Sequence, residues 1–336
     1  MYTFQPVSDR MMRLRKIYRE TYPQVSVERV RIVTDFYQQH PDEPILLKRA
    51  KLLMEVVRQS TLRVEEDELI VGNIAPTYRG ATLLPELGID WLYDELRDGS
   101  FESRGDTEEG YYIAPEDKAY LFTTEAYWRK HSVSAGMACA APDGLKSTYG
   151  SGVISYGGVN MCTTPVGHFN TNYDKVLYKG FGKVRDEARA KMDELEGRIF
   201  GNDAEKYVFY KSVTIVCDAA IHLAVRYAAL CRKKANEASG DRRKELIQMA
   251  SSLEWILENP CRTYWEAAQA LFLYQIIMTL DAANHALSIG RLDQYLWPYL
   301  EADLEKNRIT ISAAQEIMDC LFLKIADINK IWPLAG

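Results

Sequence analysis

The sequence predicts a mainly α-helical fold with a small β component. Apolar residues recur at helical spacing from Ser26 to Thr61 and almost continuously beyond Tyr173. Between these parts, residues 73–172 are irregular and rich in glycine, proline and aromatic residues. A chain of 336 residues with 47% hydrophobic and 26% charged residues can bury a large core. We therefore expect a globular, helix-rich protein.

The first part of the chain is predicted to form two helices. Apolar residues recur at helical spacing from Val27 to Phe36, and again after Pro44. Ser26 is the predicted N-cap of the first helix, because its hydroxyl can accept a hydrogen bond from the first turn. The run from Asp67 to Gly72 ends a short apolar, β-prone stretch at a glycine, and it predicts a short strand or an extended turn.

Residues 73–172 are predicted to line a cavity. A long irregular stretch inside a compact protein more often serves function than connection. One helix is expected within it, around Pro115 to Lys130. The glycine-rich tract from Tyr149 to Gly158 lacks the patterns of nucleotide-binding loops, and it indicates a flexible loop or a close backbone approach.

Residues 173–330 are predicted to be helical almost throughout, with short polar connections between packed helices. The clearest helical patterns cover residues 213–229, 246–257, 265–280 and 313–325. The last residues, from Asp327 to Gly336, carry apolar side chains suited to enter another element. Because domain ends are usually polar and exposed, this pattern favours a truncated chain, with residues 1–336 forming part of one domain.

Composition argues against several classes of protein. The formal net charge is -6 and Lys and Arg are scattered among more numerous acids, so we expect no nucleic-acid partner. No uninterrupted apolar run approaches the roughly 20 residues of a membrane helix, and Met1 to Glu20 contains no signal-type stretch, so we expect a soluble, cytoplasmic protein. The six cysteines lack paired spacing and are expected to be buried free thiols: Cys139, Cys162, Cys217, Cys231, Cys261 and Cys320.

The histidines give no metal-binding pattern. None of the five stands in an H-x-x-x-H or H-E-x-x-H arrangement, so no metal site is expected. His168 follows a glycine in an irregular segment just before a helix. Such a histidine can contact a ligand, or it can bond to nearby backbone, and both interpretations stay open.

A second polar segment runs from Asp281 to Tyr295, where a long apolar helix gives way to a glycine-punctuated turn and then to another helix. Buried helix ends expose backbone groups that favour anionic or hydroxyl ligands. Arg291 and Asp293 are close in sequence, and a structural ion pair that anchors the turn is the favoured role for them.

The run from Ser288 to Tyr299 resembles the S-x-G-R-x-D-Q-Y-x-x-P-Y signature of the pyruvate formate-lyase-like domain of glycyl radical enzymes. The resemblance covers nearly the whole chain from about Ser26. Further matching motifs follow in family order: 44–50, 67–73, Arg79-Gly80, Pro85-Glu86, 115–118, Tyr127-Trp128, Gly167-His168 with Tyr173, and Pro260 with 263–268.

The resemblance implies a ten-stranded β/α barrel wrapped by helices, of which this chain would supply the N-terminal, mostly helical part as an incomplete barrel. In the family, a cysteine loop and a glycyl loop meet inside the barrel, where water and oxygen are excluded. No Gly-Cys-Val-Glu-like or Arg-Val-x-Gly-Tyr-like motif occurs in this sequence. The chain alone is therefore expected to hold no catalytic residue and to be inactive.

The resemblance also implies partners. The family's glycyl radical is installed by a separate iron–sulfur, S-adenosylmethionine-dependent activating enzyme, so the chain itself is expected to bind no cofactor. The complete enzyme is expected to be a homodimer that acts on a small organic molecule.

The closest pattern is that of dehydratase-type members resembling glycerol and propanediol dehydratases. By this resemblance, the segments around the two histidines line the substrate cavity. The diol-type pattern has a serine where this chain has Ala286, which removes one hydroxyl partner and weakens the case for a glycerol-like substrate. The predicted substrate-binding residues are His168, Asn284, His285 and Ser288.

The sequence thus predicts part of a glycyl radical lyase that eliminates a C–O bond. One alternative within the family is an aryl- or alkyl-acetate decarboxylase, in which the aromatic segment from Tyr111 to Tyr156 walls the pocket. An alternative of another class is a helical scaffold protein that docks a partner through the apolar residues from Ile331 to Leu334.

Overall fold

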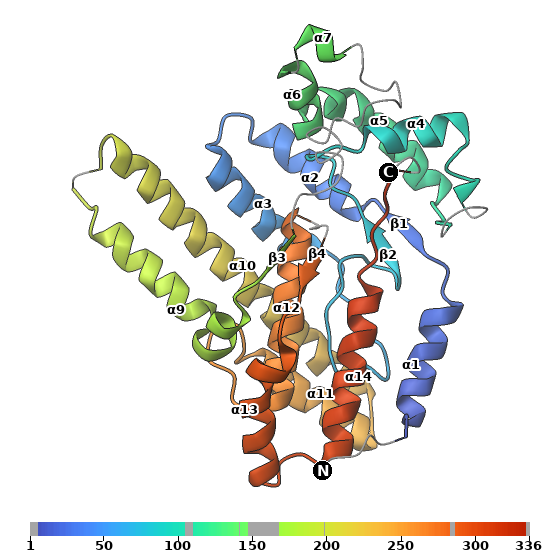
Figure 1. Cartoon of the computed structure of the whole chain (residues 1–336), viewed down its shortest axis with the longest axis vertical. Helices are drawn as coiled ribbons and strands as arrows, with labels where there is room; N and C mark the ends of the chain where they lie inside the picture. Colours follow the sequence, from blue (N-terminus) through green and yellow to red (C-terminus); the bar gives the residue numbers. More distant parts are fainter. Residues whose placement is uncertain are drawn as a thin grey trace.

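The protein is described here by a computed structural model that covers residues 6–104, 110–140, 142–146, 168–197, 199–282 and 286–333. Helices make up most of these residues, and short strands lie near the middle of the molecule (Figure 1). The predicted fold class, mainly α with some β, is confirmed.

Helices α1 (Asp9–Glu20), α2 (Glu28–Gln39) and α3 (Ile45–Gln59) form the first part of the chain, and α2 and α3 are the two predicted helices. The predicted N-cap is wrong by one position. Ser26 ends strand β1 (Gln24–Ser26), and Val27 occupies the cap position without a side-chain bond. Pairing with β2 holds Ser26 in the strand, so its hydroxyl only accepts a 3.4 Å hydrogen bond from the N–H of Glu28.

The segment after α3 forms the extended turn that was one of the two predicted forms, and it forms no strand. The side-chain amide of Gln269 takes the place of a neighbouring strand, because it bonds both the N–H and the C=O of Val71 at 2.8 Å. Gly72 has a φ of 149°, and a Cβ at this position would stand 2.6 Å from the ring of Phe272. Glycine is therefore required for this segment to lie against α12.

The described part of residues 73–172 is more helical than predicted. Helix α5 (Pro115–His131) is the expected one, but α4 (Asp90–Asp98), α6 (Val133–Ala140) and α7 (Asp143–Lys146) were missed. Helix α4 is too short for its apolar residues to show a clear helical spacing. It is stabilised by the packing of Leu92, Tyr93 and Leu96 in a separate small core. The glycine-rich tract 149–158 lies outside the described residues.

The C-terminal part consists of long helices, as predicted, and Figure 1 shows α9 and α10 projecting together to one side. Helix α12 runs through the main core, where residues such as Phe272 are fully buried. The bounds are α9 Tyr173–Asp193, α10 Asn202–Glu237, α11 Gly240–Leu253, α12 Tyr264–Ala282, α13 Leu292–Glu305 and α14 Ile311–Asp327.

Helix α10 is long and apolar enough to cross a membrane, a feature that a search for uninterrupted apolar runs did not reveal. Its charged residues explain its role here. Asp218 accepts a 3.1 Å bond from Arg185 of α9, and Arg226 donates a 2.9 Å bond to the carbonyl of Ser60, next to α3. The helix packs against α3, α9 and α11, so it is a core helix of this fold.

The strands form two parallel pairs. Strand β1 pairs with β2 (Gly80–Thr82), and isolated bridges add Tyr112 beside Gln24 and Asn329 beside Ala81. Strand β3 (His168–Asn170) pairs with β4 (Ala286–Ser288). Each pair joins segments far apart in sequence, as the crossover connections of parallel strands require. Short parallel strands enclosed by helices agree with the β/α architecture that the sequence motif implies.

The cysteines follow the predicted pattern with one exception. Cys217, Cys231, Cys261 and Cys320 are buried free thiols, whereas Cys139 on α6 is exposed, because α6 lies at the periphery of the fold. Cys162 lies outside the described residues.

Candidate functional site

Strands β3 and β4 bring together the two segments that the sequence singled out. In their parallel register His168 lies opposite Ala286, and Asn170 lies opposite Ser288. His285 directly precedes Ala286, so the backbones of the two predicted histidine segments meet at one place. The side chain of His168, together with Asn284 and His285, lies outside the described part of the structure. The substrate-binding roles of these residues therefore stay predictions.

A cavity of about 330 Å³ lies beside β4, between α12 and the chain that follows α14. Gln275 is 4% exposed and donates a 3.2 Å bond to the carbonyl of Leu287, so it fixes β4 to α12. Thr279, one helical turn later, bonds back to the carbonyl of Gln275 at 2.9 Å. The cavity is lined by Gln275, Thr279, Leu287, Ile325, Ile328, Lys330 and Trp332.

Ser288 lies next to this cavity without lining it. Its hydroxyl accepts a 3.2 Å bond from the N–H of Gly290, and the residue is exposed. Because successive strand residues face opposite sides, Leu287 faces the cavity and Ser288 faces away from it. A substrate-binding role for Ser288 stays a prediction, and the cavity beside β4 does not support it.

Arg291 and Asp293 form the ion pair that the sequence favoured. Their two side-chain bonds measure 2.9 and 2.5 Å, and both side chains are about two-thirds exposed. The pair closes the turn before α13, where Gly290 has a φ of 62°. Such an exposed pair contributes little stability, so its effect is local to the turn.

The cavity-lining chain after α14 is held by polar contacts on its backbone. The hydroxyl of Tyr111 donates a 3.0 Å bond to the carbonyl of Lys330, and the guanidinium of Arg104 donates a 2.7 Å bond to the carbonyl of Trp332. Asn329 forms an isolated parallel bridge with Ala81 of β2. The backbone of residues 329–332 is therefore held by contacts with three residues that lie far from it in the sequence, Ala81, Arg104 and Tyr111.

Asp327, at the end of α14, anchors the start of this chain. The carboxylate is almost fully buried, accepts a 2.7 Å bond from the N–H of Arg79 and forms an ion pair with Arg63. Lys324 lies 3.6 Å from it and bonds to Glu68 at 2.7 Å.

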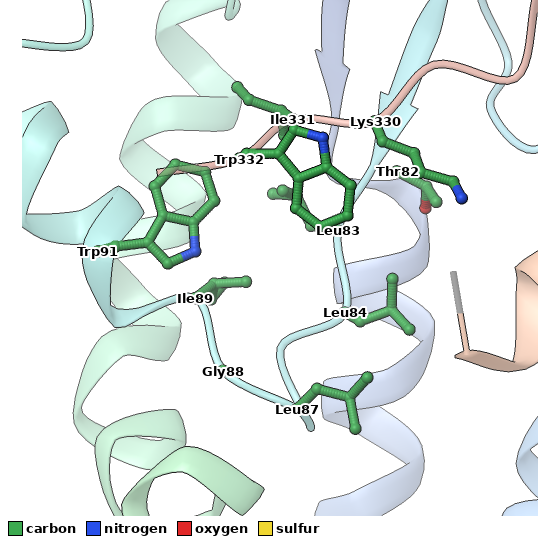
Figure 2. Close-up of a pocket in the computed structure, with 10 residues that line it drawn as sticks. All are labelled: Thr82, Leu83, Leu84, Leu87, Gly88, Ile89, Trp91, Lys330, Ile331 and Trp332. Atoms are coloured by element: carbon green, nitrogen blue, oxygen red, sulfur yellow. The ribbon is translucent and has the colours of Figure 1, made fainter. Parts of the chain in front are cut away.

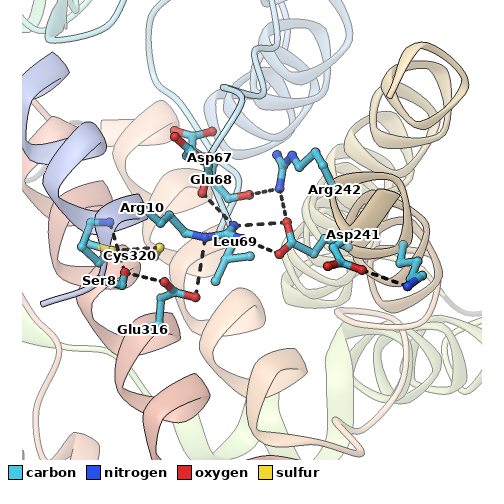
Figure 3. Close-up of polar contacts among 12 residues, drawn as sticks. Ser8, Arg10, Asp67, Glu68, Leu69, Asp241, Arg242, Glu316 and Cys320 are labelled. Atoms are coloured by element: carbon cyan, nitrogen blue, oxygen red, sulfur yellow. Dashed lines mark hydrogen bonds and ion pairs between the residues drawn. The ribbon is translucent and has the colours of Figure 1, made fainter. Parts of the chain in front are cut away.

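A network of ion pairs and hydrogen bonds, shown in Figure 3, connects α1 to α14 and to the extended turn. Arg10 pairs with both Glu245 and Glu316, and its Nη1 donates a 3.1 Å hydrogen bond to the carbonyl of Asp67. Arg242 of α11 bonds the carbonyl of Glu68 at 2.9 Å. These contacts join α1, α11 and α14 to the extended turn.

A buried network of ion pairs and hydrogen bonds around Glu86 fixes the end of α12, which leads toward β4. Glu86 is 2% exposed and pairs with Arg29 at 2.6 Å and with Arg49 at 3.3 Å. Arg29 also bonds the carbonyl of Leu280 at 3.0 Å, and Arg49 that of Asp281 at 2.7 Å. Burial would raise the pKa of Glu86, but the charges and hydrogen bonds of the two arginines outweigh it and hold that pKa below its ordinary value.

Burial lowers the pKa of Lys330 to about 8. The described residues that line the cavity include no carboxylate. The described residues also contain no group of three His, Cys, Asp or Glu that could hold a metal ion. The side chains that line the cavity can bind and orient a ligand and can exclude water from it.

Sequence reasoning missed the residues that line the cavity. Gln275 and Thr279 lie inside an apolar helical pattern, and nothing in that pattern distinguishes them from other buried polar residues. Lys330 and Trp332 belong to the terminal stretch whose apolar character was noticed, but it was interpreted as the entry to another element. Only the tertiary structure shows that these four residues meet.

Comparisons with known proteins agree with the fold and the motif. The chain matches the family described as pyruvate formate lyase-like over residues 5–335. It is 32% identical over 311 residues to the "Probable dehydratase YbiW" of Escherichia coli (strain K12), covering 92% of this chain and 38% of that protein. It is also 32% identical over 337 residues to an isethionate sulfite-lyase of Desulfovibrio desulfuricans, covering 98% of this chain and 40% of that protein.

Solved structures give the same result. The structure reported for 1,2-propanediol dehydration in Roseburia inulinivorans has a TM-score of 0.91 at 29% identity, over 99% of this chain and 39% of that chain. The glycerol-bound B12-independent glycerol dehydratase of Clostridium butyricum also has a TM-score of 0.91 at 29% identity, over 99% of this chain and 41% of that chain. The chain thus spans about 40% of the length of these proteins. Because the family match runs through nearly every residue, the chain belongs to the pyruvate formate lyase-like family, as its Ser288–Tyr299 motif predicts.

Proposed function

We propose that this chain supplies one wall of the substrate cavity of a glycyl radical lyase, and that the lyase removes a hydroxyl group from a small organic substrate by C–O elimination. The observation that carries this proposal is the parallel pairing of β3 with β4 beside a cavity. This pairing joins the two segments whose histidines are predicted to bond substrate hydroxyls.

The described residues suit a binding and shielding role. Gln275 and Thr279 offer polar groups on a rigid, buried helix, and Trp332 provides apolar surface that keeps water from the substrate. Hydrogen-atom abstraction would be supplied by a cysteine and a glycine, and neither family motif occurs in this sequence. We therefore propose that the chain by itself performs no radical chemistry.

Elimination is favoured over decarboxylation for two reasons. Three of the four proteins compared above are named for dehydration or as dehydratases, with 1,2-propanediol and glycerol named in the two structures, and the fourth is named for elimination of sulfite from isethionate. The decarboxylase alternative requires an aromatic wall from residues 111–156, but no residue of the described part of that segment lines the cavity beside β4. Tyr111 instead uses its hydroxyl to hold the carbonyl of Lys330.

The partners follow from the same proposal. A separate S-adenosylmethionine-dependent activating enzyme would install the radical, and the complete enzyme would be a cytoplasmic homodimer acting on a small molecule. The cytoplasmic location is supported by the five described cysteines, all of which are free thiols. The scaffold alternative is less favoured, because Ile331 is buried against the small core and does not form an open docking surface.

The test begins with the gene. The codons after that for Gly336 are read for a cysteine loop and a glycyl loop. The protein encoded by the complete reading frame is then activated anaerobically and assayed with 1,2-propanediol, glycerol, isethionate and an aryl acetate. The proposal expects both loops and loss of water from 1,2-propanediol or glycerol. A frame without the loops would contradict the proposal, and so would a product formed only by loss of sulfite from isethionate or of CO2 from the aryl acetate.

A further inference from the structure

Two cavities share residues of the C-terminal segment, and their sizes decide which of them can hold a ligand. Lys330 and Trp332 line both. The cavity between this segment and the loop that follows β2, shown in Figure 2, measures about 30 Å³, which is room for about two water molecules. The cavity beside β4 measures about 330 Å³, within the roughly 300–1,000 Å³ range of small-molecule sites. Of the two, only the cavity beside β4 is large enough for a small organic ligand.

Helix α12 forms one wall of this cavity, and Gln275 presents a hydrogen-bond acceptor there. Its Nε2 donates to the carbonyl of Leu287 at 3.2 Å. Because a carbonyl can bond only to the nitrogen of a carboxamide, this contact fixes which way the side chain is oriented. Among the described residues Oε1 accepts no hydrogen bond, yet it does not belong to the buried polar atoms that lack a partner. Since Gln275 lines the cavity, this oxygen remains accessible to a ligand.

Thr279 offers a second acceptor one helical turn along α12. Its hydroxyl donates its hydrogen to the backbone carbonyl of Gln275 at 2.9 Å, so only the lone pairs of the oxygen remain for a ligand. Residues four apart on a helix lie on the same face, with Cβ atoms roughly 5–6 Å apart. Both residues line the cavity, so α12 brings two acceptors to one wall.

These acceptors define which ligand group fits the α12 wall. A carboxylate or a sulfonate has no hydrogen to donate, and the two oxygens repel its charge. An ammonium group can donate, but Lys330 lines the same cavity, and like charges in one site disfavour each other. A hydroxyl donates without adding charge, and it can also accept from the remaining N–H of Gln275. Two neighbouring acceptors therefore match two neighbouring hydroxyls.

We propose that Gln275 and Thr279 are specificity-determining residues that accept hydrogen bonds from the two hydroxyls of a vicinal diol in the cavity beside β4. The carbon chain of the diol packs against apolar residues of the lining, which include Leu287, Ile325 and Trp332. The identification of the diol as the substrate rests on the proposed function, whereas its binding does not. The inference adds a wall of α12 to the contacts predicted for the β3 and β4 segments.

Ligand binding to the full chain tests this inference without radical chemistry. The probes are 1,2-propanediol and 1,2-dimethoxypropane, in which methylation removes both donors and keeps both oxygens. Calorimetry or saturation-transfer NMR compares their affinities. We expect the diol to bind roughly five- to a hundredfold more tightly, which is the effect of two hydrogen bonds.

Substitutions on α12 separate the acceptors from the shape of the cavity. Thr279→Val keeps the shape of the side chain and removes its hydroxyl, so the preference for the diol over the diether should fall about two- to tenfold. Thr279→Ser keeps the hydroxyl and should keep the preference. Gln275→Met should lower the preference by a similar factor. A shift of β4 would change the affinity for both probes, so the ratio of the two affinities reports the lost acceptor.

Thr214→Val is the matched control. The hydroxyl of Thr214 makes the same kind of bond, to the carbonyl of Lys211 in α10 at 2.7 Å, and Thr214 does not line the cavity beside β4. Its substitution should leave the preference for the diol unchanged. Thermal unfolding of each variant shows whether it is folded, and if Gln275→Met does not fold, Thr279→Val decides alone.

Equal affinity of the wild-type chain for the two probes would overturn the inference. A folded Thr279→Val or Gln275→Met variant that keeps the wild-type preference would overturn it as well. If the preference is found and the complete enzyme eliminates nothing, only the proposed function fails. If the complete enzyme eliminates water and the preference is absent, only the role of the two α12 residues fails.

Discussion

Glu86 and Lys330 are charged residues near the candidate site, but Glu86 is buried and Lys330 is half-buried, and their surroundings differ. Glu86 lies between two arginines that stabilise its charged form. Lys330 lies in cavities whose described linings hold no carboxylate. Glu86 therefore belongs to a structural ion network, whereas the ammonium form of Lys330 is disfavoured by its partial burial.

The surroundings of Lys330 predict an unusual dependence on pH. Its pKa falls from the ordinary 10.5 to about 8 because burial disfavours the ammonium form. Between about pH 8 and 10.5 the unfolded chain binds more protons than the folded chain at this residue, so its contribution makes the free energy of unfolding rise with pH. Lys330→Met should remove that part of the rise, which denaturant titrations across this range will measure.

Amine acylation followed by mass spectrometry checks the same pKa directly. Lys330 should become reactive with a midpoint near pH 8, while Lys244, whose pKa is raised by its hydrogen bond to Asp241, should react only at higher pH. Equal midpoints for the two lysines would contradict the account of Lys330.

Glu86→Gln should strongly destabilise the fold. The substitution leaves buried Arg29 without its carboxylate, whereas half-buried Arg49 keeps Asp281, and breaking a buried pair in this way costs about 3–5 kcal/mol. Since the folded-state pKa of Glu86 lies below its ordinary 4.5, the wild-type contribution is complete above that pH and is lost as the pH falls below it.

Urea unfolding at pH 7 and at pH 4 measures this effect. Asp241→Asn is the control, because Asp241 pairs with Lys244 on the exposed surface and its loss should leave the midpoint unchanged. A Glu86→Gln variant as stable as the wild type would show that the network does not hold α12.

At the scale of elements, helix α9 contains a kink that fixes its place on the fold. Gly180 has a φ of 74°, and the N–H groups of Phe181 and Gly182 bond the carbonyls of Leu257 and Glu258 at 2.5 and 3.1 Å. These bonds dock α9 onto the loop between α11 and α12. Because β3 directly precedes α9, the kink also helps to determine where β3 meets β4.

Gly180→Ala should therefore cost more than an ordinary glycine substitution. A Cβ at this position would lie 2.4 Å from the carbonyl oxygen of Glu258. The positive φ alone costs about 1–2 kcal/mol, and the steric conflict should add about 1–3 kcal/mol. Gly197→Ala is the matched control, since Gly197 has a φ of 77° and open space around it. Equal losses of stability in the two variants would rule out the docking role of the kink.

The sequence predicted helices correctly where a helix buries one of its own faces, because its apolar residues then recur at regular helical spacing. Helices α2, α3, α5 and the long C-terminal helices follow regular apolar periods, and each was identified. Helix α4 was missed because it has little more than two turns, and tertiary packing and the left-handed Gly99 fix its limits. The strands were missed because each has only three residues and pairs with a segment distant in the sequence.

At the scale of the whole molecule, the sequence motif identified the family but not the cavity. Several motif residues have structural roles: Glu86 holds α12, Asn73 accepts a bond from buried Tyr227, and Tyr299 bonds the carbonyl of Leu177 at 3.0 Å. The cavity-lining residues come from three separate parts of the chain: α12, β4, and the stretch from Ile325 to Trp332. Their meeting depends on crossover connections that no local pattern reveals.

The central claim is that residues 168–170 and 286–288 pair in one parallel register beside the cavity. Disulfide cross-linking in the full chain tests it most directly, in a background where Cys139 and Cys162 are replaced by serine. The buried Cys217, Cys231 and Cys320 should not interfere, because burial raises the pKa of each thiol to about 12.

Asn170→Cys combined with Ser288→Cys places two cysteines at partner positions, where adjacent strands bring Cα atoms to about 4.8 Å, within disulfide range. Asn170→Cys combined with Ala286→Cys is two residues out of register, at roughly 8 Å, beyond that range. The account predicts rapid, near-complete oxidation of the first pair and little of the second. Equal oxidation of both pairs, or none of the first, would contradict the juxtaposition on which the proposed site depends.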